Sequence, residues 1–108
     1  MPVASHIIPP PSSYFYLKVI APNYANWTIY ANASDNWYAY YSGSGSTMFG
    51  PAYAGQPGTM VTFNVTSVGN CPSPSVTYEP SNTLSLGSGA NYETIIINCQ
   101  PLFNVDFN

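Results

Sequence analysis

Apolar and polar residues alternate with a period of two along most of this chain, and this pattern restricts the fold more than any other feature. In residues 59–68, Val61, Phe63 and Val65 alternate with polar side chains. Comparable runs occupy residues 14–21, 26–31, 36–41, 75–78, 83–86, 92–99 and 102–107. A period of two places successive side chains on opposite faces of a strand, so each run predicts a strand with one buried face.

Proline and glycine separate these runs. Eleven Pro and eight Gly are spread over 108 residues, which leaves no room for long helices. We therefore expect an all-β chain, with residues 13–108 forming a single immunoglobulin-like β-sandwich of seven or eight short antiparallel strands. Residues 1–12 are expected to form an extended N-terminal tail, because Pro9–Pro11 imposes a stiff polyproline II spacer.

Residues 42–58 interrupt the alternation and are predicted to form a long loop. The segment contains Ser-Gly-Ser-Gly-Ser, and long loops in compact domains are usually functional or disordered. Two interpretations stay open. The loop is either a plain crossover between the two sheets, or a contact loop in which Phe49 and Tyr53 bury against a partner.

Charged residues are scarce: one Lys, no Arg and four acidic residues give a net charge of −3. Binding to nucleic acid and to anionic membranes depends on Lys and Arg, so neither partner is expected. No apolar run approaches the roughly 18 residues that span a bilayer, so we do not expect a transmembrane protein. Residues 1–12 lack the features of a signal peptide, so we expect either a removed signal or another route out of the cell.

The same scarcity argues against catalysis. The carboxyl groups of Asp35, Glu79, Glu93 and Asp106 are scattered along the chain, and the only imidazole, His6, lies in the tail. Glycoside hydrolysis needs two carboxyls roughly 5–10 Å apart, and no motif places them so. We expect no enzyme activity and no cofactor. So few titratable groups also predict a stability that changes little in acid, and hence acidic surroundings.

Cys71 and Cys99 are the only cysteines, and each lies beside a turn signal. We expect a disulfide between them, because closing a loop of this length contributes roughly 3.6 kcal/mol in the chain-entropy model. Two buried free thiols in a reducing compartment are the alternative. A zinc site is not expected, since His6 is the only imidazole that could join the two thiols.

Three N-glycosylation sequons begin at Asn26, Asn32 and Asn64. Asn26 and Asn64 fall on the polar faces of their predicted strands, and Asn32 falls in a predicted turn. All three are therefore expected to face solvent, as an attached sugar requires. We expect N-linked glycans at these positions; the alternative is coincidence in a surface rich in Asn and Thr.

A group of aromatic residues offers a possible platform for a surface carbohydrate. Its members are Trp27, Trp37, Tyr38, Tyr40 and Tyr41. Flat ring faces suit the apolar faces of sugars, but core packing and subunit interfaces use the same residue types. Both interpretations stay open.

Two segments suit strand donation, in which an extended strand of one chain completes a sheet of another. Val3–Ile8 precedes the proline spacer, and Val3, Ile7 and Ile8 are its expected contact residues. Leu102–Phe107 is more simply an edge strand of its own domain. A tail, a stiff spacer and a domain form the layout of a subunit that joins head to tail and grows filaments.

The low charge, the abundance of Tyr, Asn, Ser and Thr, the sequons and the predicted β-sandwich together resemble crenarchaeal cell-surface and viral proteins of hot acidic springs. Within that group the chain looks like thread-type, donor-strand subunits of extracellular filaments. The resemblance implies a glycosylated, extracellular structural subunit whose main partner is itself. A virion surface protein and a lectin-like adhesion module are the alternatives. The chain departs from antibody-type domains, since Trp27 and Trp37 both precede Cys71.

Overall fold

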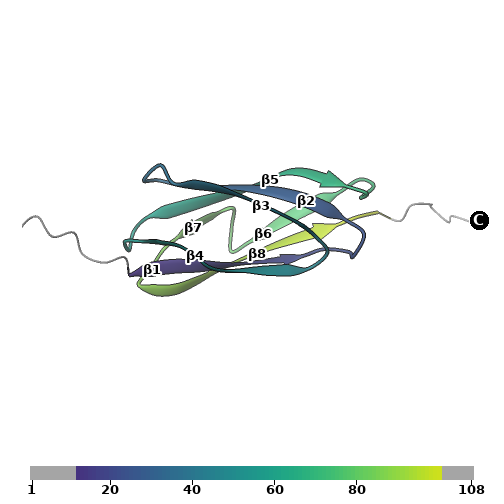
Figure 1. Ribbon diagram of the computed structural model, residues 1–108. Helices are drawn as coiled ribbons and strands as arrows, with labels where there is room; N and C mark the ends of the chain where they lie inside the picture. Colours follow the sequence, from purple (N-terminus) through teal and green to yellow (C-terminus); the bar gives the residue numbers. More distant parts are fainter. Residues whose placement is uncertain (1–11, 101–108) are drawn as a thin grey trace, which may run out of the picture.

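The computed structural model describes residues 12–100 as two β-sheets packed face to face (Figure 1). Eight strands follow one another along the chain: β1 (Ser13–Ile20), β2 (Asn26–Ala33), β3 (Tyr38–Ser44), β4 (Thr47–Gly55), β5 (Met60–Gly69), β6 (Ser75–Glu79), β7 (Thr83–Ser85) and β8 (Gly89–Asn98). This part of the chain contains no helix, and hence none that could cross a membrane. The predicted all-β sandwich is confirmed; the strand predicted at Leu102–Phe107 lies outside the described residues.

Each sheet has four strands, and the core lies between them. Sheet A has the strand order β4-β1-β8-β6 and sheet B the order β3-β2-β5-β7. In β1 and β2, buried and more exposed side chains alternate, as the period of two predicted. The core is formed mainly by the inward-facing residues Phe15, Leu17, Val19, Trp27, Ile29, Ala31, Val61, Phe63, Leu84, Leu86, Ile95 and Ile97. Phe15 and Phe63 meet edge to face across the two sheets, with ring centroids 5.3 Å apart.

One strand pair departs from the antiparallel arrangement predicted from the sequence. β1 and β8 run parallel, with Ser13 beside Gly89 and Ile20 beside Ile96. A period of two is the same for either direction, so the sequence pattern could not distinguish them. Because β8 is the last described strand, the described chain enters at one end of the sandwich and leaves at the other (Figure 1). We call the end at Ser13 the leading end and the end at Asn98 the trailing end.

The loop predicted at residues 42–58 is instead occupied by the end of β3 and by β4, which cross from sheet B to sheet A. The prediction of a loop was wrong, although the crossover between sheets is present. The glycines that hid these strands lie against large rings. A Cβ at Gly43 would lie 2.9 Å from the Trp27 indole, and one at Gly50 would lie 2.7 Å from the Tyr16 ring. A glycine within a strand commonly marks such a close approach.

β6 and β7 make a second crossing between the sheets. β6 pairs with β8 from Thr94 to Asn98, and the chain then passes to sheet B, where β7 pairs with β5. Between residues 12 and 100, no strand covers residues 89–93 of β8 on this side. This stretch is therefore an open edge of sheet A, close to the leading end.

Candidate interaction surfaces

All three sequon asparagines lie on one surface, the outer face of sheet B. Asn26 and Asn32 lie on β2 and Asn64 lies on β5, and all three are exposed. The prediction of a turn at Asn32 was wrong, because β2 continues to Ala33, which pairs with Val61 of β5. Glycosylation stays a prediction, and the exposure that it requires is present.

The outer face of sheet B carries mainly neutral polar side chains, with Met60 of β5 as an exposed apolar residue among them. Its other outward residues on the four strands include Asn26, Thr28, Tyr30, Asn32, Tyr38, Tyr40, Ser42, Ser44, Thr62, Asn64, Thr83 and Ser85. Their hydroxyl and amide groups exchange hydrogen bonds with water and with each other. Thr28 and Ser42, for example, join β2 to β3 through their hydroxyls at 3.3 Å.

Three tyrosines on this face, Tyr30, Tyr38 and Tyr40, form what we call the sheet B cluster. The ring centroid of Tyr30 lies 4.9 Å from that of Tyr40 and 6.2 Å from that of Tyr38. Tyr38 is 63% exposed and Tyr40 is 64% exposed. Tyr38 and Tyr40 were predicted as platform residues and Tyr30 was not, although the alternation along β2 places Tyr30 on the same face.

The other aromatic residues considered as a sugar platform face the core. Trp27 is buried, and its Nε1 donates a hydrogen bond to the carbonyl oxygen of Gly45 at 2.9 Å. Trp37 and Tyr41 are half-buried and pack against the core. The five residues therefore do not form one platform, and of the five only Tyr38 and Tyr40 remain available at the surface.

The outer face of sheet A has a different chemistry. Tyr14, Tyr16 and Tyr92 form a second cluster, the sheet A cluster, in which the rings of Tyr16 and Tyr92 stack with centroids 5.4 Å apart. Ile20 and Met48 add exposed apolar surface, at 38% and 58% exposure. None of the three sequons lies here. Lys18 lies between Tyr16 and Ile20 on the same face. Several exposed apolar and aromatic side chains on one face favour contact with another protein.

A hollow of about 360 Å³ adjoins the sheet A cluster. Its walls are Tyr14 and Tyr16 of β1 together with Pro51, Ala52 and Tyr53 of β4. Aromatic and apolar walls with a few hydroxyl groups suit a protruding side chain better than a charged ligand.

Phe49 and Tyr53, the contact residues expected in the supposed loop, lie on β4 and pack against their own domain. The Phe49 ring meets the Trp27 indole edge to face, with centroids 5.9 Å apart. The Tyr53 ring lies on Trp37, with centroids 4.5 Å apart. Both side chains are therefore partly buried against the core of their own domain, and Tyr53 also lines the hollow.

Asp35 connects the two sheets at the leading end. It lies in the turn between β2 and β3 of sheet B, and its carboxylate accepts a hydrogen bond from the hydroxyl of Tyr53 on β4 of sheet A. This hydrogen bond is the main reason why the pKa of Asp35 is lowered. Desolvation, followed by the interaction with the carboxylate, raises the pKa of Tyr53 to about 12.

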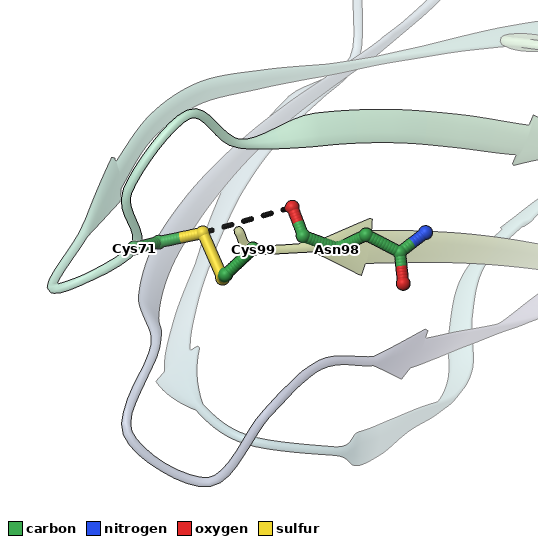
Figure 2. Close-up of a disulfide and its surroundings, with 3 residues drawn as sticks. All are labelled: Cys71, Asn98 and Cys99. Carbon is green, nitrogen blue, oxygen red and sulfur yellow. Dashed lines mark hydrogen bonds between the residues drawn. A yellow bond between two sulfur atoms is a disulfide. The ribbon is translucent and has the colours of Figure 1, made fainter. Parts of the chain in front are cut away.

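The predicted disulfide is confirmed, and it connects the two sheets at the trailing end (Figure 2). Cys71 follows β5 of sheet B and Cys99 follows β8 of sheet A, with a Cα–Cα distance of 5.1 Å. The Sγ atom of Cys71 also lies 3.8 Å from the carbonyl oxygen of Asn98. Because an oxidised sulfur has no proton to donate, we treat this approach as a close contact.

One carboxyl group lies inside the sandwich. Glu93 points from β8 into the core, at the level of Leu17 on β1, and has no exposed surface. Within residues 12–100 neither of its carboxyl oxygens has a hydrogen-bond partner, and burial raises its pKa to about 8. Because the Glu93 carboxyl has no exposed surface, a substrate in solution cannot reach it. It adds a dependence of stability on pH that the composition did not predict.

The expected contact residues of the tail, Val3, Ile7 and Ile8, lie outside the described residues, as does Asp106. Comparison with known proteins adds no relative. No known protein family matches the chain, and neither a curated protein nor a solved structure is significantly similar to it. Function is therefore inferred from the two faces and the two ends of the sandwich.

Proposed function

We propose that this protein is a structural subunit of an extracellular filament in which copies join head to tail. The observation that carries the proposal is the parallel pairing of β1 with β8. It places Ser12 and Gln100 at opposite ends of the sandwich, separated by a strand of 10 residues (Figure 1), which spans about 30 Å. A subunit that reaches a different neighbour from each end makes a contact that need not close, and such contacts grow filaments.

Strand donation would join successive copies. Val3–Ile8 precedes the leading end, so it would reach the trailing end of the next copy. That end has a hollow of about 530 Å³ beside the disulfide, lined by Tyr24, Asn70, Cys71 and Pro72. In return, Leu102–Phe107 would reach the open edge at residues 89–93 of the neighbour, where backbone groups of β8 can pair with an added strand.

The outer face of sheet A would supply contacts between the sides of neighbouring copies. In the free subunit this face exposes apolar surface to water at Tyr92, Met48, Ile20 and the adjoining hollow. A contact that covers this surface would be favoured by the hydrophobic effect. Lys18 and Glu79 are the charged residues of this face. Assembly should therefore depend little on salt, because screening acts on charges.

An extracellular location fits the same proposal. Disulfides persist in oxidising surroundings, and the three sequons lie on an exposed face. A filament on a cell surface and a coat on a virion surface would use the same contacts.

Electron microscopy of the purified protein tests the proposal. We expect the full chain to form filaments that persist in 1 M salt, and we expect a variant without residues 1–12 to stay monomeric. Filaments that form without residues 1–12 would contradict strand donation by the tail. A full chain that is monomeric at every concentration, and that binds sugars with or without the tail, would favour the carbohydrate-binding alternative.

A further inference from the structure

The sheet B cluster lies directly beside two of the three sequons. Asn64 of β5 is the cross-strand partner of Tyr30, and Asn32 of β2 is the cross-strand partner of Tyr38. Side chains paired across strands have Cβ atoms about 4.5–5.5 Å apart. Tyr30 also precedes Asn32 by two residues on the same face of β2, about 7 Å along the strand.

The third sequon has no such neighbour across the sheet. Asn26 pairs with Ser44 on one side and with Gly69 on the other. The residue two positions further along the same face is Thr28, and Tyr24, two positions earlier, lies in the turn before β2. Two sequons are thus paired across strands with tyrosines of the cluster and the third, at Asn26, is not, so Asn26 serves as an internal comparison.

A sugar attached at Asn32 or Asn64 would begin within reach of the tyrosine rings. A pyranose presents C–H groups on one face, and these carry slight positive charge. The face of an aromatic ring is negative, so the two surfaces attract each other as well as excluding water. The exposed rings of Tyr38 and Tyr40 are already held in place by Tyr30, so little further order is lost when a sugar packs on them.

We propose that the sheet B cluster is the docking platform for the first pyranose residues of the glycans on Asn32 and Asn64. This inference rests on the proposed glycosylation of the sequons. The glycans would then lie along the outer face of sheet B instead of extending freely from it. They would cover the tyrosines and keep this face out of subunit contacts.

Proton NMR of the glycosylated protein tests this inference. We expect the ring protons of the first sugars on Asn32 and Asn64 to be shifted upfield by the tyrosine rings, and those of the sugar on Asn26 to keep ordinary shifts. In Tyr30→Ala and in Tyr38→Ala, neither of which creates a new sequon, the upfield shift at Asn32 should decrease. Ser85→Ala, on the same outer face but outside all three sequons and paired with Met60, serves as the control and should change none of the three signals.

The outcomes separate the two proposals. Mass spectrometry that finds no sugar on Asn32 and Asn64 would contradict the glycosylation and this inference together. Sugars that are present, but resonate at Asn32 and Asn64 as they do at Asn26, would overturn only the platform. An upfield shift that survives both tyrosine substitutions would overturn it as well.

Discussion

The two outer faces of the sandwich carry similar tyrosine clusters in different surroundings. On sheet A, Tyr92 stacks on Tyr16, which lines an apolar hollow, and the same face exposes Ile20 and Met48. On sheet B, Tyr40 lies beside Tyr30 and Ser42, on a face that also carries the three sequon asparagines. The rings of Tyr92 and Tyr40 are almost equally exposed, at 63% and 64%. Aromatic residues alone therefore do not define an interaction surface; their neighbours indicate what they contact.

This difference gives the two faces separate tasks in our account. The apolar surroundings of the sheet A cluster favour contact with another protein chain. The hydroxyl and amide groups around the sheet B cluster stay hydrated and favour attached sugars. Two connections join the sheets that carry these faces: the disulfide at the trailing end and the Asp35–Tyr53 hydrogen bond at the leading end.

A matched pair of substitutions has the largest expected effect. Tyr92→Lys places a charge in the proposed contact of sheet A, and burying an unpaired charge costs about 3 kcal/mol or more. The critical concentration for assembly should rise roughly 100-fold, which corresponds to about 2.7 kcal/mol. Tyr40→Lys changes an equally exposed ring on sheet B and should leave that concentration nearly unchanged. Light scattering over a dilution series measures both, and equal effects would break the comparison.

Removal of the disulfide that connects the two sheets should lower the free energy of unfolding. The double variant Cys71→Ser/Cys99→Ser is expected to lose roughly 3–4 kcal/mol of unfolding free energy, because the open chain gains entropy when unfolded. Urea unfolding followed by tryptophan fluorescence gives this number. The native protein in reducing agent is the control and should show the same loss, whereas a loss below about 1 kcal/mol would show that the connection between sheets contributes little.

Glu93 makes the interior beneath sheet A sensitive to pH. Its pKa is raised from 4.5 to about 8 in the folded protein, so the folded state binds a proton that the unfolded state has lost. The free energy of unfolding should be highest below about pH 4.5, fall as the pH rises, and level off above about pH 8. The slope is at most about 1.4 kcal/mol per pH unit.

Melting curves between pH 4 and pH 9 measure this dependence. Glu93→Gln keeps the shape of the side chain and cannot ionise, so its melting temperature should change much less over the same range. Glu79→Gln removes a carboxyl from the exposed end of β6 and should retain the native slope. A native protein that is equally stable at pH 4 and pH 8 would contradict the buried state of Glu93.

The Asp35–Tyr53 connection should have the smallest effect, because Asp35 is exposed. Tyr53→Phe removes the hydrogen bond that lowers the Asp35 pKa, so that pKa should return toward its ordinary value. The connection stabilises the fold above the ordinary pKa of 3.8, and the benefit disappears as the pH falls through the lowered pKa. Carboxyl NMR titration checks this shift, and an unchanged titration would exclude the hydrogen bond in solution.

Much of the fold could be predicted from the sequence because side chains alternate between the two faces of a strand. The period of two gave the strands, and it placed Asn26 and Asn64 on the solvent side. The same rule missed β4 and the end of β3, because glycines such as Gly43 and Gly50 have no side chain to alternate. It also could not give the parallel direction of β8, since direction depends on long-range packing.

The candidate surfaces were harder to predict for a related reason. The inward direction of Glu93 was hidden by the run of isoleucines that follows it in β8, where both faces are apolar. Trp27 and Tyr40 were both considered as sugar contacts, although the alternation along their strands places Trp27 among the inward residues and Tyr40 among the outward ones. Tyr30 could have been found, since it lies two residues before Asn32 in an alternating strand.

Chemical modification of tyrosines tests the division between the two faces most directly. The protein is nitrated in its assembled form and in its dissociated form, and each tyrosine is then quantified by mass spectrometry. We predict that assembly strongly reduces the modification of Tyr92 and leaves Tyr38 and Tyr40 unchanged. Protection of Tyr38 and Tyr40 on assembly, with Tyr92 unaffected, would contradict the account.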